Sequence, residues 1–239
     1  MSITYITIKD RVDGFGAQYQ AFLSGIAYCN YNNYIYIHTP FTLIDHNVDI
    51  TKANNFIGIN NNNNLYDSSC KIIEKTCECD VHWCETPSIY YTDKVVEYIR
   101  NCYFSTEKPV VQEIDIAIHI RRGDVTNDNK NNNRYTDNNF YIELIKKLKV
   151  KYPTYTITIF SEGIYEDFKD LGLEENCFSL NTDVFETFHS LVSSKVLIQS
   201  FSSFSYCAGI INNNIVYHFD SFWHKKLDCW LKLSSLMED

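Results

Sequence analysis

Apolar residues in the second half of the chain alternate between short β-branched runs and longer segments with helical spacing. This pattern predicts strands over Ile114–Ile120, Tyr155–Phe160, Lys195–Gln199 and Ile215–His218. Between the strands it predicts helices over Asn139–Lys149, Tyr165–Leu171, Val184–Leu191 and Ser203–Ile211. Strands separated by helices in this way are typical of parallel β/α units. The last apolar segment, "WHKKLDCWLKL" over residues 223–233, has Leu227, Trp230 and Leu231 at helical spacing and predicts a packing helix.

The first half begins with a similar unit. Alternating β-branched residues predict a strand over Ile3–Ile8. The strand is followed by the glycine turn "DGFGAQ" and then by an apolar pattern with helical spacing. A second strand is predicted over Tyr34–His38 and a helix over Thr92–Cys102, whereas residues 40–90 show no clear pattern. The polar, proline-containing "STEKPV" marks the expected boundary, so we predict α/β domains over residues 1–108 and 109–239. Two Rossmann-like halves of this kind would bind a ligand in a cleft beyond the carboxyl ends of their strands.

Composition and charge narrow the choice of partners. The chain has 239 residues, a net charge of −9 and 45% hydrophobic residues, as expected of a globular protein with a substantial core. A negative net charge argues against nucleic acid or an anionic membrane as a partner. The sequence shows no apolar segment of transmembrane length, and the N-terminus "MSITYITIKD" does not resemble a signal peptide. The sequence therefore predicts a soluble, cytoplasmic protein that binds any anion through a local cluster.

Nine cysteines, an odd number, are spread along the chain and are typical of reduced thiols in the cytosol. One group is dense and contains Cys70, Cys77, Cys79, His82 and Cys84. Three thiols and an imidazole can hold zinc, but the paired C-x-x-C spacing is missing. Reduced cysteines are therefore the preferred interpretation, and a zinc-organised interaction protein is one alternative.

The stretch "HIRRGD" follows a predicted strand and is the strongest chemical signal. Alternation along Ile114–Ile120 places His119 and Arg121 on the same side of the strand end. Arginine forks bind phosphate oxygens in a bidentate way and keep their charge, so Arg121 and Arg122 suit a pyrophosphate. Asp124 can hold an arginine in place or accept from a ligand hydroxyl. The alternative is an ordinary Arg–Asp pair at the surface.

Two further turns also follow predicted strands. "QSFSSFSY" supplies Ser202 and Ser203 at the start of a helix, where N–H groups and hydroxyls can bind an anion without a metal. Its alternative interpretation is simple helix N-capping. In the first turn, Gly14 and Gly16 allow a ligand to approach the backbone closely, but a G-x-G alone is a weak signal.

The order of "GFGAQ", "HIRRGD", "KYPTYTITIFSEG" and "FHSLVSSKVLIQSFSSFSY" resembles that of the fucosyltransferase superfamily, which includes α1,2- and α1,6-fucosyltransferases. The similarity covers the second half almost continuously and a short part of the first. It implies a GT-B-type fold and an enzyme that moves L-fucose from GDP-fucose to a glycan hydroxyl. The family inverts the anomeric carbon and needs no metal or other cofactor. A catalytically inactive module that binds a nucleotide sugar is the second alternative.

The resemblance also implies roles for individual residues. Arg121 and Arg122 would neutralise the pyrophosphate, His119 would contact guanine or ribose, and Asp124 would orient the arginines or the sugar. The remaining donor-binding residues would come from the turns and their flanks, namely Gly14, Phe15, Gly16, Glu162, Ser202, Ser203 and Phe204. A carboxylate that usually holds guanine is replaced by Thr187 here, so this role would fall to Asp183 or Glu186. The candidates for the general base are Asp13, Asp124 and Glu162.

Overall fold

A computed structural model describes residues 4–9, 12–60, 72–128 and 132–238 of the chain. The chain divides into two compact units. Unit 1 contains residues 1–108 together with 223–227, and unit 2 contains residues 109–222 and 228–239. The division after Lys108 falls in the "STEKPV" segment, and the short return of residues 223–227 to unit 1 was not part of the sequence prediction.

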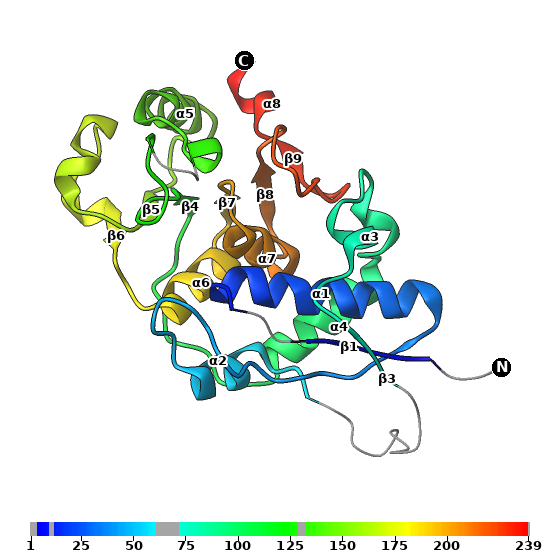
Figure 1. The fold of residues 1–239 in the computed structure, drawn as a ribbon. Helices are drawn as coiled ribbons and strands as arrows, with labels where there is room; N and C mark the ends of the chain where they lie inside the picture. Colours follow the sequence, from blue (N-terminus) through cyan, green and yellow to red (C-terminus); the bar gives the residue numbers. More distant parts are fainter. Residues whose placement is uncertain (1–3, 10–11, 61–71, 129–131, 239) are drawn as a thin grey trace. The chain divides into compact units, whose positions relative to one another are not determined.

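Unit 1 is built around a small parallel sheet with the strand order β2-β1-β3. Its elements are β1 (Tyr5–Ile8), α1 (Phe15–Asn32), β2 (Ile35–Tyr36), α2 (Ile50–Ile57), β3 (Ile72–Lys75), α3 (Cys79–His82), the 3-10 turn η2 (Pro87–Ile89) and α4 (Asp93–Phe104). The predicted strand Tyr34–His38 is therefore only two residues long, and the described parts of residues 40–90 contain α2, β3, α3 and η2. Figure 1 shows α1 lying along β1.

The core of unit 1 is aromatic. The ring of Phe15 lies 5.9 Å from that of Phe41 and 6.1 Å from that of Phe56, and Phe22 lies 4.8 Å from Phe41. Contacts of this kind add to the burial of apolar area. Because α1 supplies both Phe15 and Phe22, this cluster fixes the helix and the turn that precedes it.

Unit 2 contains a parallel sheet with the strand order β6-β5-β4-β7-β8-β9. Its strands are β4 (Ile116–His119), β5 (Ile157–Ser161), β6 (Phe178–Leu180), β7 (Val196–Ile198), β8 (Ile215–His218) and β9 (Leu231–Lys232). Its helices are α5 (Asn138–Lys151), α6 (Val184–Ser193), α7 (Ser203–Ile211) and α8 (Ser234–Met237). The 3-10 turns are η3 (Asn132–Arg134), η4 (Tyr165–Asp167), η5 (Lys169–Leu171) and η6 (Glu175–Cys177). These elements confirm the predicted α/β class.

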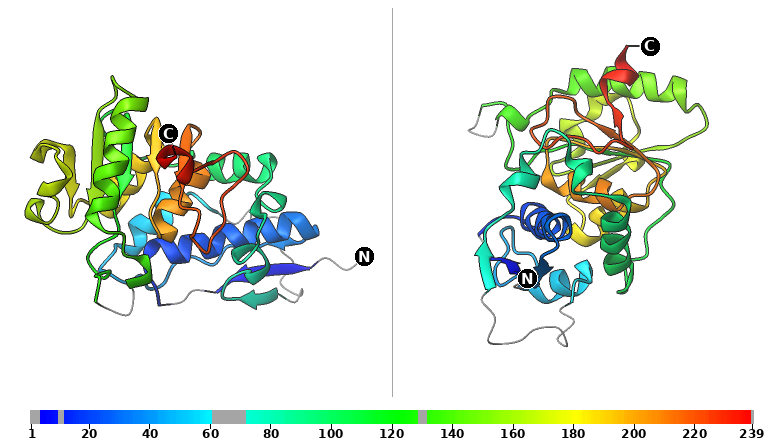
Figure 2. Two further views of the ribbon diagram at one scale, coloured as in Figure 1. Left: turned by 90° about the horizontal axis from the view of Figure 1, so that it is seen from above. Right: turned by 90° about the vertical axis from the view of Figure 1, so that its right-hand side faces the viewer.

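The helices of unit 2 cover both faces of its sheet. In the strand order, β5 lies on one side of β4, and β8 lies on the opposite side of β7. Because β/α/β crossovers are right-handed, the connecting helices α5 and α7 lie on opposite faces of the sheet. Accordingly, α5 packs against α8, and α7 packs against α6 (Figure 2). All of β4 and β7 is buried between these layers.

Two helix predictions in this half are wrong. Over Tyr165–Leu171 the structure has the separate turns η4 and η5, because the buried Phe168 between them adopts a non-helical backbone with φ −129° and ψ 0°. Residues 223–233 do not form the predicted packing helix. Leu231 and Lys232 instead pair with Tyr217 and His218 as the edge strand β9, so pairing with the sheet outweighs the local helical spacing.

Candidate active site

The strand order of unit 2 creates a switch point between β4 and β7. The chain leaves these neighbouring strands in opposite directions, and sheets with this topology bind ligands where the loops at such strand ends diverge. His119 is the last residue of β4, and Arg121 and Asp124 follow it. Ser200 and Ser202 follow β7. The arginine turn, "HIRRGD" (residues 119–124), and the serine turn, "QSFSSFSY" (residues 199–206), therefore lie at adjacent strand ends.

His119 is held as a neutral imidazole. It is buried, with 7% of its surface exposed, and its Nδ1 lies 2.8 Å from Oγ of Ser200. Burial, with the nearby charge of Arg121, lowers the pKa of His119 to about 3. Its ring lies 5.6 Å from the ring of Phe204 on α7. His119 can therefore take part in hydrogen bonds to a ligand, but it does not carry a positive charge at neutral pH.

A network of buried hydrogen bonds supports the serine turn. The Ser200 N–H donates to Oγ of Ser205 (3.1 Å), and Ser205 Oγ–H donates to the carbonyl of Ser202 (3.3 Å). Nε2–H of Gln199 donates to the Ser205 carbonyl (3.1 Å), and Oε1 of Gln199 lies 2.6 Å from Nδ1 of His218. Sequence inspection missed Ser200, Ser205, Gln199 and His218, although the dense run of polar residues after a buried strand was visible.

Ser202 and Ser203 occupy the start of α7. Ser202 is the N-cap, and its Oγ accepts the N–H of Phe204 (3.3 Å), as the capping interpretation expected. Ser203 is the first residue of the helix and is partly exposed. Capping leaves the Ser202 hydroxyl hydrogen available for a different acceptor, so the cap and an anion contact are compatible.

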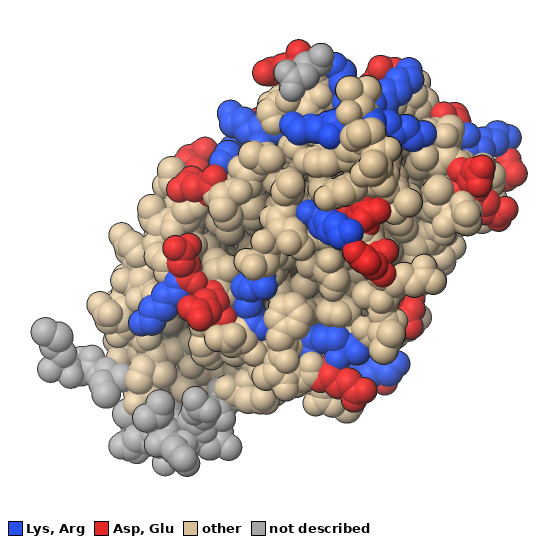
Figure 3. Space-filling view, turned by 180° about the vertical axis from the view of Figure 1, so that it is seen from behind, with Lys and Arg blue, Asp and Glu red and all other residues tan. Residues whose placement is uncertain are grey.

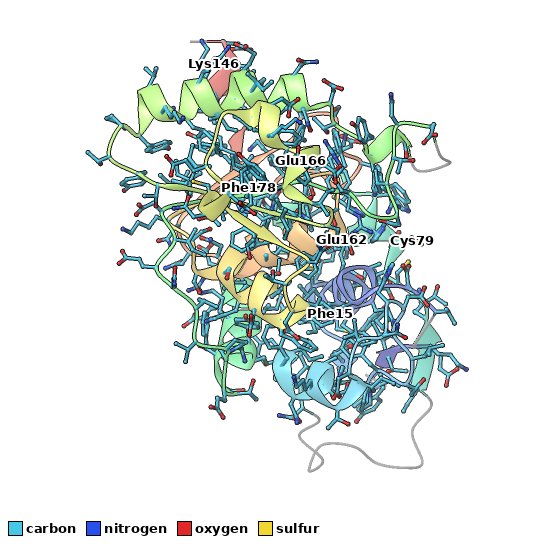
Figure 4. All side chains as sticks on the ribbon, turned by 90° about the vertical axis from the view of Figure 1, so that its left-hand side faces the viewer. Phe15, Cys79, Lys146, Glu162, Glu166 and Phe178 are labelled. Carbon is cyan, nitrogen blue, oxygen red and sulfur yellow. The ribbon has the colours of Figure 1, made fainter. Side chains whose placement is uncertain are left out.

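Arg121 lies between two carboxylates. Its guanidinium is 2.5 Å from Asp124 Oδ1 and 3.9 Å from Glu162 Oε2. Glu162 follows β5, where Figure 4 labels it, and half of its side chain is exposed. The turn at Glu162 is fixed to the end of β6, because Gly163 and Asn181 exchange two hydrogen bonds of 3.0 and 2.7 Å. Arg121 thus remains partly exposed at the end of β4 in a fixed position.

The side chain of Arg122 has different surroundings. Its guanidinium donates to the carbonyls of Arg121 and Thr136 (both 2.9 Å) and to Oδ1 of Asn138 (2.8 Å). It also lies 4.3 Å from the ring centre of Tyr135. These contacts join the loop after β4 to the start of α5. The sequence assigned the same role to both arginines, but the structure gives them different partners.

The predicted guanine residues lie on α6. Asp183 is the N-cap of α6, where its Oδ1 accepts the N–H groups of Phe185 (2.8 Å) and Glu186 (3.2 Å). The side chain of Glu186 is exposed on the first turn. Thr187, which stands in place of the usual carboxylate, has its Oγ1 2.7 Å from Oγ1 of Thr182.

The glycine turn belongs to unit 1. The Gly14 N–H donates to Asp13 Oδ1 (2.9 Å), and the buried Gln18 holds the turn by donating from Nε2 to the carbonyl of Asp13 (2.8 Å). Phe15 is 3% exposed and packs in the aromatic core at the start of α1, where Figure 4 labels it, and Gly16 is also buried. Sequence inspection missed His46, whose ring lies beside Gly14.

Charged side chains of both signs are mixed on the surface of the protein (Figure 3). On the face drawn in Figure 3, the Lys and Arg side chains of the described residues lie among Asp and Glu side chains. Among the described residues, no helix has both the length and the apolar character needed to cross a membrane.

The switch point of unit 2 places the arginine turn beside the serine turn, and the comparison with known families gives this arrangement its class. The chain belongs to glycosyl transferase family 11, whose family model matches residues 80–219. This match includes the arginine and serine turns and confirms the resemblance to the fucosyltransferases. It assigns the protein to the glycosyltransferases.

Comparison with known proteins adds two weak structural similarities. A point mutant of FUT1 from Arabidopsis thaliana, in complex with GDP, has a TM-score of 0.46 and 9% identity over 92% of this chain and 71% of that chain. The E. coli heptosyltransferase WaaC, with ADP-2-deoxy-2-fluoro heptose, has a TM-score of 0.41 and 11% identity over 98% of this chain and 96% of that chain. No curated protein sequence matched the chain.

Proposed function

We propose that the protein transfers L-fucose from GDP-fucose to a glycan hydroxyl in an α1,2 or α1,6 linkage, with inversion and without a metal. The observation that carries this proposal is the position of Arg121. It lies at the switch point of unit 2, between Asp124 and Glu162, and its strand adjoins the one that leads into the serine turn. Family membership supports the transfer chemistry, and the site supports an anionic leaving group.

In the proposed step, the bond between the anomeric carbon and a β-phosphate oxygen breaks, and its electron pair goes to GDP. The guanidinium of Arg121 and the N–H groups at the start of α7 would stabilise the developing negative charge. Both groups are already fixed by protein contacts, so little reorganisation is needed when the charge develops. Arg122 would act indirectly, by holding the loop after β4 against the start of α5.

The acceptor oxygen would attack the opposite face of the sugar and release its proton to a base. Among the carboxylates of unit 2, Glu162 suits this role because its side chain is 51% exposed and lies 3.9 Å from Arg121. Asp124 is engaged more closely, at 2.5 Å from the same guanidinium. Asp13 in unit 1 remains a candidate, with one of its oxygens bonded to the Gly14 N–H.

We assign the recognition of guanine to Glu186. Guanine offers two neighbouring N–H donors, which an exposed carboxylate can accept together. Asp183 is less suited, because its Oδ1 already accepts two backbone N–H groups.

Nucleotide binding tests the donor assignment. GDP should raise the melting temperature more than ADP or UDP at the same concentration, since a ligand in hundredfold excess over Kd stabilises the native state by about 2.7 kcal/mol. Glu186→Gln should reduce this preference. Glu166→Gln is the matched control, because Glu166 is also exposed but pairs with Lys169 in η5. Equal shifts with all three diphosphates would refute recognition of guanine.

Turnover tests the reaction. We expect GDP release from GDP-fucose to continue in excess EDTA, because the arginine and the helix start supply the positive potential. An absolute requirement for Mg²⁺ or Mn²⁺ would refute the metal-independent mechanism. GDP binding without release of GDP from the donor, with any glycan acceptor, would instead favour an inactive binding module.

A further inference from the structure

The cysteine group after β3 has no role in the proposed transfer reaction. Among the described residues, no three His, Cys, Asp or Glu side chains are grouped as a metal site, and Cys70 lies outside those residues. The structure nevertheless brings two members of the group into contact. The Sγ atoms of Cys77 and Cys79 lie 3.8 Å apart.

We propose that Cys77 and Cys79 form a thiol–disulfide exchange site whose substrate is a small-molecule disulfide. The Cys79 thiolate attacks one sulfur of that disulfide, and the other sulfur leaves as a thiol. The Cys77 thiolate then attacks Sγ of Cys79 and releases the second small thiol. In total, the two cysteines lose two protons and two electrons, and the small disulfide is reduced to two thiols.

The exposure of the two thiols indicates which cysteine attacks the small disulfide first. Cys79 is exposed at the start of α3, where Figure 4 labels it, so an incoming disulfide can reach it. Cys77 is half-buried, which suits a thiol that attacks an adduct already formed next to it. Attack by Cys77 requires no second molecule, so it should be faster than loss of the adduct to solvent thiols.

The residue between the two cysteines keeps them aligned. Glu78 has an extended backbone, with φ −92° and ψ 97°, which places its two neighbours on the same side of the chain. Its N–H donates to Oγ of Ser24 on α1 (3.2 Å), and its buried carboxylate lies 3.6 Å from Nζ of Lys75. Its carbonyl accepts the N–H groups of Val81 (3.1 Å) and His82 (2.9 Å). The pair is therefore positioned by contacts with α1, β3 and α3.

The buried cysteines provide an internal comparison. Cys29 and Cys207 are buried, and burial raises the pKa of the Cys29 thiol to about 12 and that of Cys207 well above its ordinary value. A thiol that stays protonated is a poor nucleophile, so these two cysteines should not react in the folded protein. Cys29 and Cys207 should therefore stay reduced in the presence of a small disulfide, whereas Cys79 is open to it.

The test uses oxidised glutathione as the probe. The reduced 239-residue chain is incubated with it, remaining thiols are blocked by alkylation, and peptides are mapped by mass spectrometry. We expect a peptide that links Cys77 to Cys79, is lighter by two hydrogens and is reversed by dithiothreitol. In Cys77→Ser, glutathione should stay attached to Cys79. In Cys79→Ser, the linked peptide should be absent.

Cys84→Ser is the matched control. Cys84 is in the same segment, but its Sγ lies 3.9 Å from Oγ1 of Thr86. This variant should form the Cys77–Cys79 link as efficiently as the natural chain. A stable glutathione adduct on Cys79 of the natural chain, equal in yield to that of Cys77→Ser, would refute the proposal. So would reduced Cys77 and Cys79 after incubation, or a link from either of them to another cysteine.

Discussion

Nδ1 of His119 lies 2.8 Å from Oγ of Ser200, which joins the carboxyl ends of the neighbouring strands β4 and β7. The imidazole is neutral, so one of its nitrogens carries a hydrogen and the other accepts. If the Ser200 hydroxyl donates to Nδ1, the hydrogen of His119 stays on Nε2. Ser200 would then determine which hydrogen bond His119 can offer to the donor nucleotide.

Replacement of Ser200 by Ala tests this relationship. We expect Ser200→Ala to lower the free energy of unfolding by about 1–3 kcal/mol, because it leaves Nδ1 of His119 buried without this partner. If Ser200 also orients His119, KM for the donor should rise more than kcat falls. Ser194→Ala is the control, since Ser194 is equally buried and donates to the Leu191 carbonyl (3.0 Å) before β7. A rise in KM of the same size in both variants would contradict the positioning role.

The buried histidines predict how stability depends on pH. Burial lowers the pKa of His119 to about 3 and that of His38 to about 4, whereas an unfolded histidine has a pKa near 6.5. Below about pH 6.5 the unfolded chain therefore binds protons that the native protein does not bind. Stability should fall as the pH falls from about 6.5 towards 4, by up to ~1.4 kcal/mol per pH unit for each histidine.

Urea denaturation at pH 7, 6 and 5 measures this slope. His119→Gln and His38→Gln should each reduce the slope, whatever their effect on stability at pH 7. His38 packs against Phe22 in the aromatic core of unit 1 and is not a proposed donor contact, so only His119→Gln should also weaken GDP binding. Parallel pH profiles for the natural chain and both variants would show that these histidines do not control acid stability.

Arg121 and Arg122 should respond differently to substitution. Arg121→Ala should reduce donor turnover by a factor on the order of 10²–10³, the usual effect of losing a fixed group that stabilises developing charge. Its ion pair with Asp124 is partly exposed, so we expect a stability loss of at most about 1 kcal/mol. Arg122→Ala removes donors to two carbonyls and to Asn138, so it should cost more stability than Arg121→Ala.

Turnover and melting temperature measured on the same proteins separate the two roles. Arg121→Lys should recover only part of the turnover, because an ammonium group keeps the charge but loses the fork. Asn138→Ala removes one partner of Arg122 and should reproduce part of the loss seen in Arg122→Ala. Near-normal turnover in Arg121→Ala would exclude Arg121 from the reaction, whatever the result for Arg122.

The sequence predicted the β/α order of unit 2 because its strands are short apolar runs whose local preference agrees with the sheet. It predicted the wrong structure for residues 223–233, because pairing of Leu231 with Tyr217 depends on β8, which lies outside the segment whose spacing was considered. The motif "HIRRGD" located the strand end correctly. Alternation along the chain already separated Arg121 from Arg122, and this signal could have suggested their different partners.

The hydrogen bonds that support the serine turn could not be predicted from the sequence, for a different reason. Ser200 and His119 are 81 positions apart, and only the adjacency of β4 and β7 brings them together. Likewise, the serines of "SFSSFSY" have the same local signals for capping, and the folded chain alone distinguishes the cap Ser202 from the buried Ser205. The residue types indicated that these side chains form hydrogen bonds, whereas the order of the strands determines which residues are hydrogen-bond partners.

Gly123 of the "RRGD" turn lies against Glu162, and this contact gives the last prediction. Gly123 has φ +74°, and a Cβ atom there would overlap the carboxylate of Glu162. We expect Gly123→Ala to cost about 1–2 kcal/mol of stability from its left-handed backbone and to displace Glu162 as well. Turnover should therefore fall along with stability.

Gly172→Ala separates these two effects. Gly172 has a similar φ of +67°, but among the described residues no atom outside its chain neighbours lies within 4 Å of the position of an added Cβ. This variant should lose a similar amount of stability with normal turnover, as measured by urea denaturation and donor consumption. In a Glu162→Ala background, Gly123→Ala should have little further effect on turnover, since the carboxylate that it displaces is absent. A full additional loss of turnover in that double variant would show that Gly123 acts on the site through Arg121 or Asp124 and not through Glu162.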